Sequence, residues 1–183
     1  GLTLWSLSLD GTQPKSIAST LSYEEWLSFS PEGKLLMVSG GGRRELWIEK
    51  KLAIADLKSG SVDYPKIPLG KVTIDPAFYP DGSRIAFVAA EDMGDSNFYE
   101  NEEAWFESRN LWVADADGAN AREFTNAGEN IYSPIWSKDG EYILYAKNSA
   151  LWMIDDEGKN PQEIAEISHD EPWGFYGHMR FTD

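Results

Sequence analysis

The chain repeats a short segment of alternating apolar residues that ends at a glycine. The four copies are LWSLSLDG from Leu4, LAIADLKSG from Leu52, LWVADADG from Leu111 and LWMIDDEG from Leu151. Apolar residues at every second position indicate a strand with one buried face, and a glycine beside Asp or Ser suits a tight hairpin turn. An apolar residue follows each turn and marks the expected returning strand: Ile17, Ile67, Phe124 and Ile164.

A second hairpin precedes three of these copies. Its turns read FSPEG, FYPDG and WSKDG and end at Gly33, Gly82 and Gly140, with apolar residues alternating after each glycine. Proline presets φ for such a turn, and glycine accepts a positive φ. One unit is therefore two hairpins in series, a meander of four short strands. The shortest unit runs from Gly118 to Gly158, which matches the repeat of about 40–45 residues that forms a propeller blade.

These spacings predict an all-β protein, a β-propeller of four-stranded antiparallel meander blades. Three full repeats are expected over residues 20–69, 70–125 and 126–165. The half-repeats 1–19 and 166–183 are expected to form a composite blade, because unpaired strand edges favour aggregation. That arrangement gives about four blades, the small end of the propeller range. The alternative is a fragment of a larger propeller.

The order of the motifs, F/W-S-P-D-G, then LWVADADG, then F-T, resembles the repeat of TolB and its relatives. The same repeat occurs in the propellers of prolyl-oligopeptidase-type peptidases. The resemblance covers about residues 20–165 and departs at Lys138, where the pattern has proline, and at Leu52-Ala53, where it has Leu-Trp. We expect a non-catalytic scaffold that binds a protein or another ligand. TolB-like relatives bind envelope proteins, so the resemblance implies an extracytoplasmic setting, although no segment has the pattern of a signal peptide. An accessory propeller of a peptidase is the alternative.

The charge of the chain restricts its partners. Lys and Arg number 16 against 31 Asp and Glu, so the formal net charge is −15. Such a field repels nucleic acid and anionic membrane surfaces. It either serves solubility alone or attracts a basic partner or a cation. No apolar run approaches the roughly 18 residues that cross a membrane. We therefore expect a protein partner, no nucleic acid and no membrane insertion, with a basic partner as one alternative and self-association through the open ends of the propeller as a further mode.

Two insertions separate the second and third strands of neighbouring repeats, at residues 41–51 and 91–110. This connection lies at one end of every blade, so both insertions are expected to decorate one face and to build its binding surface. Residues 98–107 are expected to form one short helical turn, and no long helix is expected. The candidate partner-binding residues are Phe98, Tyr99, Glu100, Glu102, Glu103, Trp105, Phe106, Arg43, Arg44 and Trp47.

Within this set, Trp105 and Phe106 are the expected hydrophobic anchors, and the three glutamates steer the basic partner. Two alternatives remain open. The two insertions can fold on each other, with Trp47 packing and charges pairing. Trp105 can also pack on the propeller and serve folding alone. The tryptophans at positions 5, 112 and 152 recur in one column of the repeat and are expected to pack between blades.

Motifs of several enzyme classes are missing, namely the serine nucleophile G-x-S-x-G, a phosphate loop and H-E-x-x-H. His169 and His178, with Asp170 and Glu171, are the candidate ligands of a third alternative, a metal-dependent polysaccharide-lyase-like propeller. Two histidines without a third firm ligand define no coordination geometry. We therefore predict no catalytic residue, no metal site and no cofactor.

Overall fold

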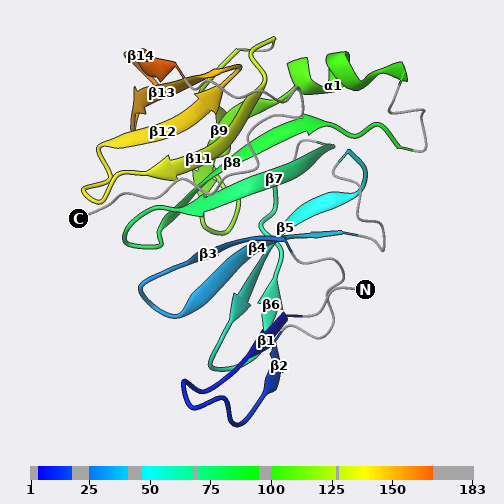
Figure 1. Ribbon diagram of the computed structural model, residues 1–183, viewed down its shortest axis with the longest axis vertical. Coiled ribbons are helices and arrows are strands. Elements are labelled where there is room, and N and C mark those ends of the chain that lie inside the picture. Colours follow the sequence, from blue (N-terminus) through cyan, green and yellow to red (C-terminus); the bar gives the residue numbers. More distant parts are fainter. Residues whose placement is uncertain are drawn as a thin grey trace.

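The computed structural model describes residues 4–17, 25–40, 47–67, 70–94, 100–126 and 128–166. Their strands form three four-stranded antiparallel sheets and one separate hairpin (Figure 1). This is a partial β-propeller, as the repeats predicted. No helix among these residues is long and apolar enough to cross a membrane.

Each sheet is a blade whose strands follow one another in the chain. Blade 1 contains β3 (Glu25–Phe29), β4 (Lys34–Gly40), β5 (Lys50–Asp56) and β6 (Val62–Asp63). Blade 2 contains β7 (Lys71–Phe78), β8 (Arg84–Glu91), β9 (Asn110–Asp115) and β10 (Arg122–Glu123). Blade 3 contains β11 (Ile131–Trp136), β12 (Tyr142–Lys147), β13 (Ala150–Asp155) and β14 (Gln162–Glu166).

The core lies between the blades. Blade 2 is sandwiched between blades 1 and 3 (Figure 1), and residues 85–88 of β8 are all 0% exposed. A strand covered on both faces reads as a continuous apolar run rather than an alternation. The outer strand β14 is the opposite case, because all of its residues are exposed. Burial therefore decreases from the middle blade outward and from the first strand of blade 3 to the last.

The first strand of every blade carries a bulge at the same place in the repeat. Trp26, Asp75 and Ser133 have φ of 50°, 48° and 52°, and the pairing register shifts beside each of them. A bulge re-aims a side chain and increases the local twist. These first strands also contact one another, β3 with β7 and β7 with β11. The bulge residues therefore lie where neighbouring blades meet.

Two of the turn glycines are required by the neighbouring blade. A Cβ at Gly118 would lie 2.4 Å from the backbone nitrogen of Lys66, and one at Gly140 would lie 2.3 Å from the hydroxyl oxygen of Tyr79. Both glycines have positive φ as well. Any side chain there would collide with the preceding blade, so these glycines set how closely the blades pack.

The register of blade 1 corrects the sequence alignment. Strand pairing places Leu52, opposite Val38, in the column of Trp112 and Trp152. The alignment by sequence had placed Ala53 there. Two more residues separate Leu52 from Gly60 than separate Trp112 from Gly118, one of them in β5 and one in the turn that follows it. Ile67 also lies outside the returning strand, which is the short β6.

A hairpin of β1 (Leu4–Ser6) and β2 (Lys15–Ile17) covers the outer side of blade 1. Its Leu4 and Ile17 pack against the small buried cluster of that blade: Leu35, Met37, Ala53 and Ala55. The expected pairing of this hairpin with residues 166–183 falls almost entirely outside the described residues, as do His169 and His178.

Candidate functional site

The connection between β8 and β9 contains the only helix in the described part of the chain, α1 (Glu102–Glu107). This confirms the expected short helical turn. Trp105 of α1 is 3% exposed and belongs to the main core. Its Nε1 donates a hydrogen bond to the carbonyl of Glu91 at 3.0 Å. The burial of Trp105 favours the alternative in which this residue packs on the propeller and serves folding.

A serine just after α1 also connects the helix to β8 by hydrogen bonds. The hydroxyl of Ser108 accepts a hydrogen bond from the backbone N–H of Glu91 at 3.1 Å and donates one to the carbonyl of Trp105 at 2.7 Å. Both ends of the connection are thereby joined at the tip of β8. Because a helix of six residues has little stability by itself, these contacts hold its position.

Arg109 connects α1 to the interior of the propeller. Its Nη2 lies 3.4 Å from Oδ2 of Asp75, and the two side chains are 12% and 3% exposed. The guanidinium carbon lies 5.3, 5.9 and 5.5 Å from the ring centroids of Trp105, Phe106 and Tyr132. Stacking on rings while paired to a carboxylate is a preferred environment for arginine. Sequence reasoning missed this pair.

The same carboxylate joins two blades. Oδ2 of Asp75, on the bulge of β7, accepts a hydrogen bond of 2.9 Å from the backbone N–H of Ser133, on the bulge of β11. Blade 2, blade 3 and α1 therefore share one buried polar centre. One sequence feature relates two members of this centre. Asp75 and Ser133 each precede a proline at the same place in the repeat, in DPAF and SPIW.

The outer side of α1 is acidic. Glu100, Glu103 and Glu107 are exposed and Glu102 is partly exposed, and no basic residue lies in the last turn of the helix. Phe106 is half-buried, with its ring at 62° to that of Trp105 and 5.5 Å away. Two of the predicted glutamates, Glu102 and Glu103, therefore lie on the helix together with Glu107, and Glu100 lies just before it. Phe98 and Tyr99 lie outside the described residues.

The two insertions meet where the structure describes them. The carbonyl of Trp47 accepts a hydrogen bond from the N–H of Met93 at 2.9 Å, and the N–H of Glu49 donates to Oδ2 of Asp92 at 3.3 Å. The Trp47 side chain packs against the main core. The described ends thus fit the alternative in which the insertions fold on each other. Arg43 and Arg44 lie outside the described residues.

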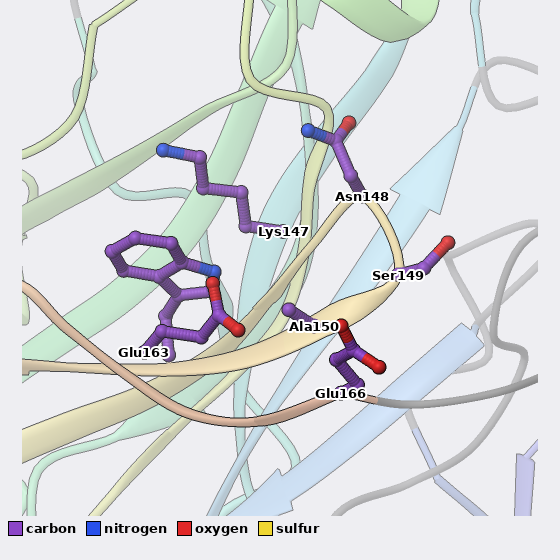
Figure 2. A pocket seen from close by; sticks show the side chains of 7 residues that line it. Lys147, Asn148, Ser149, Ala150, Glu163 and Glu166 are labelled. Carbon is purple, nitrogen blue, oxygen red and sulfur yellow. The ribbon is translucent and has the colours of Figure 1, made fainter.

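Blade 3 has the shortest connection between its second and third strands, and a pocket opens beside it (Figure 2). Its volume is about 370 Å³, and its lining residues are Lys147, Asn148, Ser149, Ala150, Trp152, Glu163 and Glu166. The sequence analysis assigned Trp152 to packing between blades. The indole does pack against the core, and it lines the pocket as well. No sequence signal marked the rest of this pocket.

The pocket and α1 are neighbours. The N–H of Gly128 donates to the carbonyl of Glu107 at 2.8 Å, and the next residue, Glu129, accepts a hydrogen bond from Nζ of Lys147 at 2.6 Å. The hydroxyl of Tyr132, whose ring faces Arg109, donates to the carbonyl of Asn148. We call this surface, α1 with the pocket beside it, the insertion face.

Beneath the pocket, Tyr145 pairs with Trp152 across the strands and is 1% exposed. Burial raises the pKa of Tyr145 to about 12, and the negative charge of Glu129 acts in the same direction. Among the described residues, no three His, Asp or Glu side chains lie close enough together to hold a metal ion.

Comparison with known proteins shows which proteins contain similar repeats. No protein-family model matches the chain. The Tol-Pal system protein TolB of Thioalkalivibrio sulfidiphilus is 39% identical over 61 residues, which are 31% of this chain and 14% of that protein. TolB of Anaeromyxobacter dehalogenans is 29% identical over 143 residues, 74% of this chain and 27% of that protein. The uncharacterized peptidase YuxL of Bacillus subtilis is 30% identical over 97 residues, 52% of this chain and 13% of that protein.

Solved structures show the same fold. TolB from Acinetobacter baumannii superimposes with a TM-score of 0.61 at 18% identity, over 88% of this chain and 37% of that one. An oligogalacturonate lyase in complex with manganese gives a TM-score of 0.68 at 12% identity, over 90% of this chain and 46% of that one. The chain spans less than a third of the length of these curated relatives. At these identities the structures establish the propeller architecture alone.

Proposed function

We propose that this partial propeller, built from TolB-like repeats, is a non-catalytic scaffold that binds a basic protein partner through its insertion face. The observation that carries the proposal is the contrast between the two sides of α1. On the inner side, Trp105 of the helix and Arg109 just after it are fixed in the core, whereas Glu103 and Glu107 of the helix and Glu100 just before it are exposed.

The fixed position of α1 favours binding, because the helix loses little further conformational freedom when a partner binds. Ordering each mobile side chain or loop at an interface lowers the affinity, and α1 is already fastened to β8 and to the Asp75 centre. The half-buried Phe106 adds apolar surface to the carboxylates around it. Acidic groups steer a basic partner during association, and an aromatic side chain can then contribute at the contact.

We propose an extracytoplasmic location, which the likeness of the repeats to Tol-Pal system proteins supports. In this proposal the insertion face is the part that meets another envelope protein. Salt screens attraction between exposed charges over about 8 Å at physiological ionic strength. The association rate should therefore fall steeply as salt is added.

The match to peptidase YuxL supports a second candidate function, that of an accessory propeller of a peptidase. In that case the insertion face would meet a catalytic domain instead of a separate protein. Peptidase activity of the complete gene product would favour this candidate.

A metal-dependent lyase is the third candidate. Metal analysis of the purified protein tests this candidate. A metal-dependent lyase requires a bound transition metal in stoichiometric amount, which a chelator would remove.

The proposed function is tested by a matched pair of variants. In the first, Glu100, Glu103 and Glu107 are each replaced by Gln. The control variant changes three exposed glutamates elsewhere to Gln and so has the same net charge: Glu32, Glu123 and Glu141. Both are immobilised, and the envelope proteins that they capture are quantified against the parent.

We expect at least one basic protein to be retained by the parent and by the control but lost from the α1 variant. Purified, that protein should bind the parent with an affinity that declines as salt rises. Equal capture by both variants would contradict the proposed role of α1. The comparison requires that the three proteins have equal thermal stability. We expect this because all six substituted side chains are exposed.

A further inference from the structure

The second-to-third-strand connection of blade 3 is too short to cover the side chains beside it. Those side chains form the 370 Å³ pocket of Figure 2, next to α1. We infer that this pocket receives a lysine or arginine side chain of the partner, which stacks on Trp152 between Glu163 and Glu166. The inference rests on the proposed function, because it names the group by which a basic partner is held.

The first support is the arrangement of the two carboxylates. Glu163 pairs across the strands with Trp152, and Glu166 pairs with Ala150. Since positions 150 and 152 of one strand face the same way, both glutamates lie on the side of the sheet that carries the indole of Trp152. Positions three apart in a regular strand would face opposite ways. A register shift opposite Leu151 and Trp152 inserts the extra residue that turns both carboxylates to one side.

The second support is the charge that the pocket leaves unbalanced. Nζ of Lys147 lies 2.6 Å from Oε1 of Glu129, so this cation and its carboxylate compensate each other. Glu163 and Glu166 are exposed and have no ion-pair partner among the described residues. The remaining lining groups are the indole, an amide, a hydroxyl and a methyl group. Two carboxylates beside an aromatic ring form an environment that selects a cation.

The third support is a cation that the protein itself places on this ring. Nζ of Lys147 lies 4.4 Å from the ring centroid of Trp152. The indole is therefore oriented so that it accepts an ammonium group, and the lysine is held in place by Glu129. A side chain that enters the pocket from the partner would meet this ring together with the two glutamates of β14.

Blade 2 provides the matched comparison. Its Trp112 occupies the same column and pairs with Glu123, as Trp152 pairs with Glu163. Beside Trp152 the second carboxylate, Glu166, lines the pocket together with Glu163. Trp112 and Glu123 therefore serve as internal controls for any effect of charge or aromatic stacking that is not specific to the pocket.

The test follows the indole N–H signals of the protein by two-dimensional ¹H–¹⁵N NMR, with the Trp152 and Trp112 signals assigned from the Trp152→Phe and Trp112→Phe variants. The probes are the acetylated, amidated tripeptides Gly-Lys-Gly and Gly-Arg-Gly. The control peptide has norleucine at the centre, which keeps the apolar stem and removes the charge. Methyl glucoside at the same concentration tests for a carbohydrate site.

We expect the basic peptides to shift the Trp152 signal saturably and to leave Trp112 unchanged. Glu163→Gln and Glu166→Gln should each weaken this binding roughly two- to fivefold, the range for exposed ion pairs, and Glu123→Gln should not. An equal shift with the norleucine peptide, a shift with the sugar alone, or no shift with any probe would each overturn the inference.

These results are separable from the proposed function. If the pocket inference alone is wrong, the partner captured through α1 still binds the Glu163→Gln and Glu166→Gln variants as tightly as the parent. If the proposed function is wrong and the pocket inference is right, the tripeptides still shift the Trp152 signal although no basic partner is captured. Because both glutamates are exposed on the outer strand, their substitution is not expected to unfold the protein, and a thermal unfolding curve checks this.

Discussion

Arg109 Nη2 and Asp75 Oδ2 lie 3.4 Å apart, although 34 residues separate them in the chain. The pair joins the end of the insertion helix to the bulge of the first strand of blade 2, and the same carboxylate accepts the N–H of Ser133 in blade 3. A partly buried ion pair that holds three elements has consequences for stability and for the position of α1.

Replacing either member should destabilise the protein, because the remaining charge would be left in a poorly solvated place. We expect Asp75→Asn and Arg109→Gln each to lower the free energy of unfolding by about 3 kcal/mol. The double variant should lose less than the sum, with a coupling of about 1–3 kcal/mol. Denaturant unfolding of the four proteins measures this. The exposed pair of Glu157 and Lys159 is the control, and strictly additive losses at Asp75 and Arg109 would argue against a direct interaction.

Trp105→Ala separates a structural role from a partner-binding role. The indole is in the core and donates to Glu91, so we expect a loss of about 3–5 kcal/mol of stability. Phe106→Ala should lose only about 1 kcal/mol, because its ring is half-buried. Thermal and denaturant unfolding measure both. A Trp105→Ala protein as stable as the parent would restore the interpretation of Trp105 as a surface anchor.

Gly140→Ala tests how closely the blades approach. Gly140 and Gly33 occupy equivalent turns with φ of 76° and 83°, so alanine strains the backbone in both. Only at Gly140 would the Cβ meet the ring of Tyr79, whereas the space at Gly33 is open. We expect Gly140→Ala to be about 1–3 kcal/mol more destabilising than Gly33→Ala. Equal effects would show that the backbone conformation alone requires these glycines.

The pH dependence of stability at alkaline pH should report on Tyr145. Its pKa is about 12 in the folded protein, against 10.0 for the ordinary side chain. Between these values the folded state binds the proton and the unfolded state has released it, so stability falls as pH rises. Its contribution is fully present below pH 10.0 and is lost toward about pH 12. Comparing the parent with Tyr145→Phe from pH 8 to pH 11 isolates this group from the lysines. Parallel curves would contradict the shifted pKa.

Local patterns were sufficient to predict the blades. Alternation of apolar residues, Asp-Gly turns and their spacing predicted three meanders, and the structure has three four-stranded sheets. The helical turn within residues 98–107 was predicted as well and is α1. These features depend on residues near one another in the chain, where strand periodicity and turn geometry leave few alternatives.

The site was predicted only in part. Spacing indicated the insertions and their acids, but not which side of α1 is covered, so anchoring of a partner and packing on the propeller both remained open for Trp105. The Asp75–Arg109 pair and the pocket at Trp152 each join residues that no local pattern relates. In the case of Trp112 and Trp152, identical positions in two repeats have different surroundings.

What the sequence by itself determined is the repeat: which residues are strands, where they turn and which side chains alternate inward. The tertiary structure decided where one blade ends against the next and where the register shifts. Glu163 and Glu166 show the physical reason. A period of two places them on opposite faces, and a single extra residue at the bulge of β14 brings them to the same face. Bulges depend on pairing with the neighbouring strand and on packing between blades, so they appear only when the blades are assembled.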